Sequence, residues 1–238
     1  PMDVRYNTIQ WVHRATRGWS YGSSVIDPRT GEILKGHVTL GSLRVRQDYL
    51  IAQGLTAPFK DESSNTNAVK EMALARIRQL SAHEVGHTLG IAHNFAASVN
   101  NRASVMDYPH PLVKITNGEI DLTDAYDDKI GVWDEYVIKY GYSEFATPEL
   151  EKQQLSGLIS ATKKQGYLYM SDPDARPLSG AEPNGHLWDN GANPAVELEH
   201  ILDVRKLALN NFGLINLARG RSVSDLQEKH IKVLLQFN

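Results

Sequence analysis

The sequence has no cysteine among its 238 residues. That absence excludes disulfide bonds, a thiolate zinc finger, a cysteine nucleophile and thiol redox chemistry. No apolar run approaches the roughly 18 residues that a membrane span needs, and the 25 Lys+Arg and 28 Asp+Glu residues form no basic block. We therefore expect no membrane span and no nucleic-acid partner, and any metal must be bound by histidine and carboxylate side chains alone.

The first sixty residues have the pattern of strands and turns. Residues 6–12, 19–26 and 32–38 are rich in strand-forming side chains. Residues 27–31 (DPRTG) have the composition of a turn, which predicts a hairpin between the second and third strands. Residues 39–55 are ambiguous, because they fit either a strand or the start of a helix.

A helical period begins after residue 67. Apolar residues at helical spacing predict one long helix over about 68–89, which ends at Gly90 because glycine adopts a left-handed C-cap without steric cost. The apolar positions are Met72, Ile77, Leu80, Val85 and Leu89. After an irregular stretch, further helices are predicted over residues 129–140, 148–164, 194–218 and 222–237.

The long helix carries the pattern HExxHxxGxxH, formed by His83, Glu84, His87, Gly90 and His93. Four residues of helix correspond to about 400° of rotation and about 6 Å of rise, so His83 and His87 project from one face and can bind one ion. Glu84 lies about 100° further round, where it reaches a water beside the metal as a general base. The chain folds back after Gly90 and brings His93 to the same ion. Three histidine ligands leave a fourth position open, which is the arrangement of catalytic zinc.

An ordinary polar helix face is the alternative, but it would have to explain why three of the nine histidines lie so close together. The other six have no ligand spacing: His13, His37, His110, His186, His200 and His230. Among them, His110 is the one that we expect to line a cleft at this site.

The pattern resembles the signature of the metzincin zinc endopeptidases, which add a methionine turn beneath the metal, and residues 104–109 (SVMDYP) are similar to that turn. The resemblance implies that Met106 forms a hydrophobic floor under the three imidazoles. It also implies that Tyr108 binds the resting metal and swings to stabilise the transition state, as in astacin-like and serralysin-like members; a packed ring in a turn is the alternative. Asn94, after the third histidine, matches none of the best-known subfamilies, so none of their substrate preferences carries over.

Four segments are similar to bacterial zinc-dependent metzincin-like proteases, which are usually large and exported. They are DPRTGEIL at 27–34, HNFAAS at 93–98, SVMDY at 104–108 and IGVWDEYVIKYGY at 130–142. The likeness spans about residues 5–145 and more loosely the rest. It implies an extracellular or periplasmic location, although no signal peptide is visible. It also implies that the chain is the catalytic segment of a longer protein, whose other domains are candidate partners.

The resemblance implies an α+β metzincin-like fold that forms one catalytic domain. Its N-terminal sub-domain, residues 1–93, holds a twisted mixed β-sheet and the active-site helix. The mainly helical C-terminal sub-domain, residues 94–238, holds the methionine turn.

The function implied is that of a zinc-dependent endopeptidase with Glu84 as general base and a protein or peptide substrate. The substrate is expected to extend along an edge strand, for which residues 36–43 are the candidate because they lie just upstream of the helix. Two alternatives stay open: a catalytically silent module that binds zinc and a peptide, and a zinc hydrolase of short peptides or cell-wall crosslinks. Without cysteine, any latency must come from another group.

Two groups of acidic residues lie outside the motif. Asp172, Asp174, Asp189 and Asn190 lie in a Pro- and Gly-rich loop and offer oxygen ligands of the kind that calcium takes. No EF-hand spacing is present, so a solvated loop fits them better than a calcium site does. Asp124, Asp127 and Asp128 are predicted to cap the helix that follows them.

Overall fold

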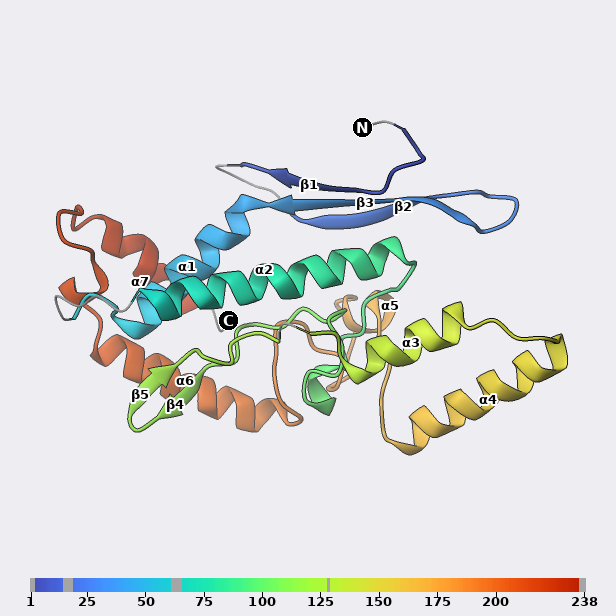
Figure 1. The fold of residues 1–238 in the computed structure, drawn as a ribbon. Helices are drawn as coiled ribbons and strands as arrows, with labels where there is room; N and C mark the ends of the chain where they lie inside the picture. Colours follow the sequence, from blue (N-terminus) through green and yellow to red (C-terminus); the bar gives the residue numbers. More distant parts are fainter. Residues whose placement is uncertain (1–2, 15–18, 61–65, 128, 236–238) are drawn as a thin grey trace.

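The structure is a computed structural model that describes residues 3–14, 19–60, 66–127 and 129–235. A three-stranded sheet lies along one side of a long central helix, α2 (Asn67–Thr88) (Figure 1). The strands are β1 (Thr8–Val12), β2 (Tyr21–Ile26) and β3 (Ile33–Gly41). Their order is β1-β3-β2, with β1 parallel and β2 antiparallel to β3. The predicted α+β class with a mixed sheet and a long helix is therefore confirmed.

The hairpin predicted around residues 27–31 joins β2 to β3. Its turn is closed by a hydrogen bond from the Asp27 amide to the Glu32 carbonyl at 2.9 Å, and Gly31 has a φ of +77°. Glycine is favoured there because a side chain would be strained at positive φ.

The prediction that residues 36–43 form the edge strand is wrong. β3 is paired on both sides, and the ambiguous segment after it becomes helix α1 (Ser42–Thr56). The edge strand beside the central helix is β2 instead. The hydrophobic pattern of a strand does not reveal its neighbours, because the partner β1 comes from a distant part of the sequence.

The sheet approaches α2 closely through small residues of β2 and β3. A Cβ atom on Gly22 would lie 1.9 Å from the Glu84 carbonyl oxygen, and one on Gly36 would lie 3.0 Å from Thr88. The Ser24 hydroxyl donates to the Thr88 carbonyl at 2.5 Å. As a result, β2 runs directly beside the part of the helix that carries the histidines.

The main core lies at the other end of α2, where it packs against α1, α6 (Pro194–Asn210) and α7 (Asp225–Leu235). A short hairpin of β4 (Lys114–Thr116) and β5 (Glu119–Asp121) lies beside these helices. The core combines residues that precede His93 in the sequence with residues that follow it, among them Ile51, Met72, Leu122, Val204 and Val233. This shared core fixes the N-terminal half of α2.

The remaining helices are α3 (Val132–Tyr142), α4 (Pro148–Lys164) and the short α5 (Asp172–Ala175). α3 and α5 lie near the end of α2 that carries the histidines, whereas α4 extends away from it beyond α3 (Figure 1). Of the 3-10 turns in the described ranges, Ser98–Asn100 follows His93, and Leu214–Asn216 contacts α1 and α7. The prediction over 148–164 is confirmed. The helix predicted over 129–140 begins later, and the one predicted over 194–218 ends earlier. The one predicted over 222–237 begins later, and its last two residues lie outside the described ranges. Within the described ranges, no helix is both long and apolar enough to span a bilayer.

Candidate metal centre

Two of the three clustered histidines lie on the last two turns of α2, and the third follows the turn that ends it. The helix ends at Thr88, and Gly90 has a φ of +78°. The Gly90 amide donates to the His87 carbonyl and the Ile91 amide to the Gly86 carbonyl, at 3.0 and 3.1 Å. These bonds close a glycine C-cap. The helix end predicted at Gly90 is confirmed, and the chain then turns back with His93.

The three imidazoles converge on one point through their Nε2 atoms. Nε2 of His87 is 3.1 Å from that of His83 and 3.2 Å from that of His93. In the described part of the chain, these three residues form the only group of three or more His, Asp or Glu side chains close enough to hold an ion.

The other nitrogen of each ring contacts an oxygen that only accepts hydrogen bonds. The Nδ1 atoms of His83 and His87 lie 2.6 and 2.9 Å from the carbonyls of Val105 and Ile91, and Nδ1 of His93 lies 2.6 Å from Asp172 Oδ2. Each Nδ1 therefore carries the proton, and in a neutral ring Nε2 holds a lone pair. Burial also lowers the pKa of His83 to about 3, which keeps that ring neutral.

Three lone pairs at this distance repel one another unless a cation lies between them. Two nitrogens bound at about 2.0–2.1 Å to a tetrahedral zinc lie about 3.3–3.4 Å apart, close to the observed separations. The Nδ1–H of each ring also donates a hydrogen bond to a protein oxygen, as in established zinc sites. The residues present therefore fit a zinc ion bound by His83, His87 and His93.

Met106 lies beneath the histidines against the backbone of α2. It is fully buried, and a Cβ atom on Gly86 would lie 2.3 Å from its sulfur. Only glycine leaves room for the thioether between the turns that carry His83 and His87. The methionine turn thus contacts the helix where the resemblance placed it.

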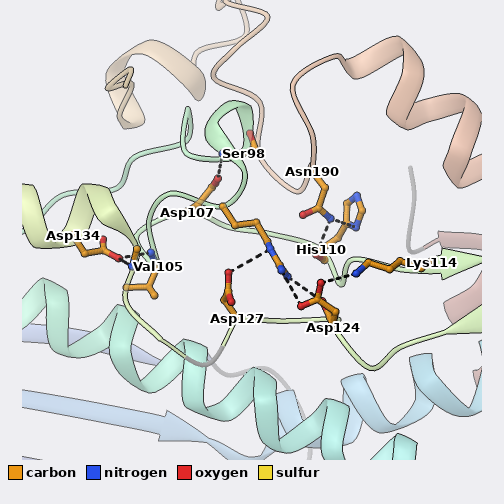
Figure 2. A network of polar contacts seen from close by, with 11 residues as sticks. Ser98, Val105, Asp107, His110, Lys114, Asp124, Asp127, Asp134 and Asn190 are labelled. Atoms are coloured by element: carbon orange, nitrogen blue, oxygen red, sulfur yellow. Dashed lines mark hydrogen bonds and ion pairs between the residues drawn. The ribbon is translucent and has the colours of Figure 1, made fainter. Parts of the chain in front are cut away.

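Asp134 of α3 holds the methionine turn in place (Figure 2). Its carboxylate accepts hydrogen bonds from the Ser104 hydroxyl and from the amides of Val105 and Gly131, at 2.5, 2.9 and 2.7 Å. Because the Val105 carbonyl is the acceptor for His83, this buried carboxylate supports the position of His83 without contacting it.

Two of the acidic residues predicted to cap α3, Asp124 and Asp127, form ion pairs instead. Arg102 pairs with Asp124 at 3.0 Å and with Asp127 at 3.4 Å, and Lys114 pairs with Asp124 at 2.7 Å (Figure 2). The capping prediction is therefore wrong for Asp124 and Asp127, since it is Asp134 that accepts the amide of the N-cap residue Gly131. Asp128 lies outside the described residues.

Glu84 is buried beside the histidines and lines a cleft of about 490 Å³. Burial raises its pKa to about 7, against the opposing effects of the Gly22 amide and the charge of Arg76. Its carboxylate is not one of the three converging ligands. This is the environment of a group that exchanges a proton near neutral pH.

Tyr108 lies against the same cluster. Its ring stacks on His83 with centroids 5.4 Å apart, and it meets His93 edge-on at 4.6 Å. On its other side it stacks on Trp188 at 5.2 Å. Burial raises the pKa of Tyr108, while Arg176 works in the opposite direction. The ring is thus packed between the histidines and the wall of the cleft.

Asn94, which follows His93, connects this part of the chain to the methionine turn and to the segment around Leu168 and Met170. Its amide donates to the Met106 carbonyl at 3.0 Å, and its side chain binds the Leu168 carbonyl and the amides of Ala96 and Met170. The residue that set this chain apart from the known subfamilies is therefore a buried structural link.

The sequence led us to expect His110 in the lining of the cleft, and this prediction is wrong. It is buried, with Nδ1 2.9 Å from the Pro111 carbonyl and 3.1 Å from Asn190 Nδ2 (Figure 2). Asp174, one of the proposed calcium ligands, accepts from the Ser171 amide at 3.2 Å. A calcium site in this loop stays a prediction.

Asp172 is the site residue that sequence reasoning missed, because it was assigned to the calcium loop. It begins α5 and lies 79 residues after His93, whose Nδ1 it accepts at 2.6 Å. Burial works against its ionisation, but the hydrogen bond from His93 and the nearby positive charges outweigh that effect and lower its pKa. A charged acceptor makes His93 a stronger metal ligand.

We expect Asp172→Ala to weaken zinc binding about 10- to 100-fold, because His93 loses the acceptor that orients it and increases its basicity. The dissociation constant is measured by competition with a chelator of known affinity. Asp172→Asn, which keeps an acceptor but loses the charge, should fall between the two proteins. Wild-type affinity in a folded Asp172→Ala protein would show that this contact does not support the metal.

A family model described as Met-zincin matches residues 65–238, well over half of the chain, including all three histidines. It does not cover the sheet or α1. No curated protein and no solved structure matches the chain.

Proposed function

The chain belongs to the Met-zincin family, and on that premise we propose that it is a zinc-dependent endopeptidase. The observation that carries the proposal is the convergence of three Nε2 lone pairs next to the buried Glu84 at an open cleft. Structural zinc sites are closed by a fourth protein ligand, whereas hydrolytic sites keep that position free. Among the described residues no fourth His, Asp or Glu ligand joins the cluster.

His83, His87 and His93 would hold the ion. When bound, zinc acidifies water and polarises a carbonyl group. Glu84 accepts a proton from the attacking water and later delivers it to the leaving amine. Its burial supports this role, because a pKa near 7 lets one carboxyl group act first as a base and then as an acid.

Tyr108 is the second catalytic group of the proposal. Its hydroxyl donates a hydrogen bond to the oxyanion that develops on the scissile carbonyl. The ring's packing between His83 and Trp188 supports this role, because a fixed donor does not have to reorganise during the reaction.

The substrate lies extended beside β2, which pairs with β3 along one edge and with no other strand in the described ranges. Trp19 and Ser20, which precede β2, line the cleft together with Glu84 and Tyr108. This supports β2, rather than residues 36–43, as the strand that aligns the peptide.

Three further proposals rest on the family resemblance alone. They are the division into sub-domains at residue 93, a location outside the cytoplasm, and partner domains in a longer protein.

The proposal is tested by incubating the zinc-loaded protein with unfolded casein and with a library of quenched peptides. We expect cleavage of both, its loss after metal removal with a chelator, and its recovery when stoichiometric zinc is added. Cleavage confined to short peptides would replace the endopeptidase with a hydrolase of small substrates. A folded, zinc-loaded protein that cleaves neither would be the silent binding module.

A further inference from the structure

The cleft beside Glu84 is lined by three arginines, Arg44, Arg76 and Arg176. We propose that Arg76 and Arg44 form a carboxylate-binding subsite that selects substrates with a negative charge close to the scissile bond. The inference rests on the proposed peptidase function, whose substrate class it narrows.

Arg76 is a buried cation without an acidic partner. Its residue is only 4% exposed, yet no carboxylate in the described ranges lies within ion-pair distance of it. It donates to the neutral Gln79 side chain and lies over the Tyr126 ring at 5.1 Å, and its Nε has no hydrogen-bond partner among the described residues. A charge removed from water in this way is costly unless it is paired. The guanidinium of Arg76 can therefore bind an anion.

The nearby acidic groups are already engaged. Asp48 Oδ2 lies 3.2 Å from Arg44, and its Oδ1 accepts from the Tyr126 hydroxyl at 2.9 Å. Asp172 pairs with Arg176 at 2.5 Å. Glu84, two turns further along α2, is the proposed base. None of these residues serves Arg76 as a dedicated partner.

Burial lowers the pKa of Arg76, and the positive charge of Arg44 adds to that effect. Arginine nevertheless stays protonated in proteins. The two like charges therefore repel each other at the inner end of the cleft, and a bound carboxylate would relieve that repulsion.

Arg44 is positioned to share the anion. It lies near the start of α1, and its guanidinium lies over the Trp188 ring at 5.9 Å. Trp188 in turn stacks on Tyr108. This stack joins the cationic end of the cleft to the proposed oxyanion donor, so an anion bound by the arginines would lie in the same cleft as the reacting carbonyl.

The spacing along α2 sets how far the subsite lies from the chemistry. Arg76, Leu80 and Glu84 follow one another at intervals of four residues, so Arg76 is about 12 Å along the helix from the proposed base. An extended peptide advances about 3.3–3.6 Å per residue. Twelve ångströms correspond to about three or four extended residues, so the subsite serves a residue within about four positions of the scissile bond and not a remote part of the substrate.

The ligand chemistry is a carboxylate, because the planar guanidinium binds it in a bidentate manner. A peptide can present one in two ways: on an Asp or Glu side chain, or as its C-terminal carboxylate. The two sources are separated by peptides that differ in only one of these groups.

The first experiment compares zinc-loaded wild type on matched quenched peptides, with Glu or Gln at each position around the cleavage site and with a free or amidated C-terminus. We expect kcat/KM to be about 10- to 100-fold higher for the charged member of one pair, the gain typical of a hydrogen bond to a charged group. The pair that shows the preference identifies the source of the carboxylate.

The second experiment assigns the preference to Arg76. Arg76→Gln should reduce the ratio of charged to neutral kcat/KM to near one, and Arg76→Lys should keep part of it. Arg78→Gln removes a solvent-exposed arginine of the same helix and should keep the wild-type ratio. If Arg76→Gln does not fold, Arg44→Gln takes its place, and the wild-type comparison still decides.

Binding gives a readout that does not need turnover. Trp19 and Trp188 line the cleft, so their fluorescence reports peptide binding to zinc-loaded Glu84→Gln protein. Equal affinity and equal kcat/KM for charged and neutral peptides would overturn the subsite and leave the peptidase standing. Binding that depends on charge, without cleavage of any peptide by wild type, would support the subsite and overturn the peptidase.

Discussion

Glu84→Gln is expected to lower kcat about 10²- to 10⁴-fold while the protein still binds one zinc ion. The reason is that the amide keeps the shape of the side chain but cannot accept the proton of the attacking water, and general-base catalysis contributes this range. Zinc binding persists because Glu84 is not among the converging ligands. The measurement combines steady-state kinetics with metal analysis of the same sample.

The pH profile gives an independent check. The base works when it is ionised, so kcat/KM should fall as the pH drops through the pKa of Glu84. Burial places that pKa at about 7, and a bound cation favours the ionised form, so the acid limb should lie at or below pH 7. The limb assigned to Glu84 should disappear in Glu84→Gln.

Glu71→Gln is the matched control, since it makes the same change at an exposed position of the same helix. It should retain wild-type kinetics. A Glu84→Gln protein with more than a tenth of wild-type kcat would remove Glu84 as the base. Loss of zinc from that protein would instead show that Glu84 helps to bind the metal.

The parts of the site that the sequence predicted well are decided by residues close together in the chain. Helical periodicity and a glycine that takes positive φ are local properties, so the two histidines of α2, the turn at Gly90 and the return of His93 follow from about a dozen residues. The position of Met106 came from a family resemblance instead, and its contact with Gly86 explains why that helix position has no side chain.

The order of the strands could not be predicted in the same way. Each strand was located to within a few residues, but β3 lies in the middle because β1 pairs with its far side. That pairing joins residues almost thirty positions apart. Alternating hydrophobicity indicates which face of a strand is buried, and it contains no information on which edge is covered.

Asp172 was missed for a related reason. The sequence SDPD around it indicates the start of a short helix, with Ser171 and Asp174 as its caps, but nothing local shows that this start meets His93. Arg76 did offer a signal. It lies at core spacing between Met72 and Leu80, and a charged residue at such a position of an amphipathic helix calls for a partner.

Tyr108→Phe is expected to lower kcat about 10²- to 10³-fold with little change in KM, because it removes one hydrogen-bond donor that acts on the developing oxyanion. The packing should persist, since the ring contacts with His83 and Trp188 do not use the hydroxyl. Zinc affinity and thermal stability should therefore stay at wild-type values. Steady-state kinetics on one peptide, with KM and kcat determined separately, measures the effect.

Tyr140→Phe, on the exposed side of α3, removes a hydroxyl away from the cleft and should leave kcat unchanged. A fall in kcat confined to Tyr108→Phe, with equal substrate affinity, assigns the hydroxyl to the transition state. A fall in zinc affinity would instead indicate that the phenol oxygen binds the resting metal. A Tyr108→Phe protein within threefold of wild type in both respects would reduce Tyr108 to a packed ring in the methionine turn. Glu84 would then be the single side chain, besides the three histidines, on which the proposed chemistry depends.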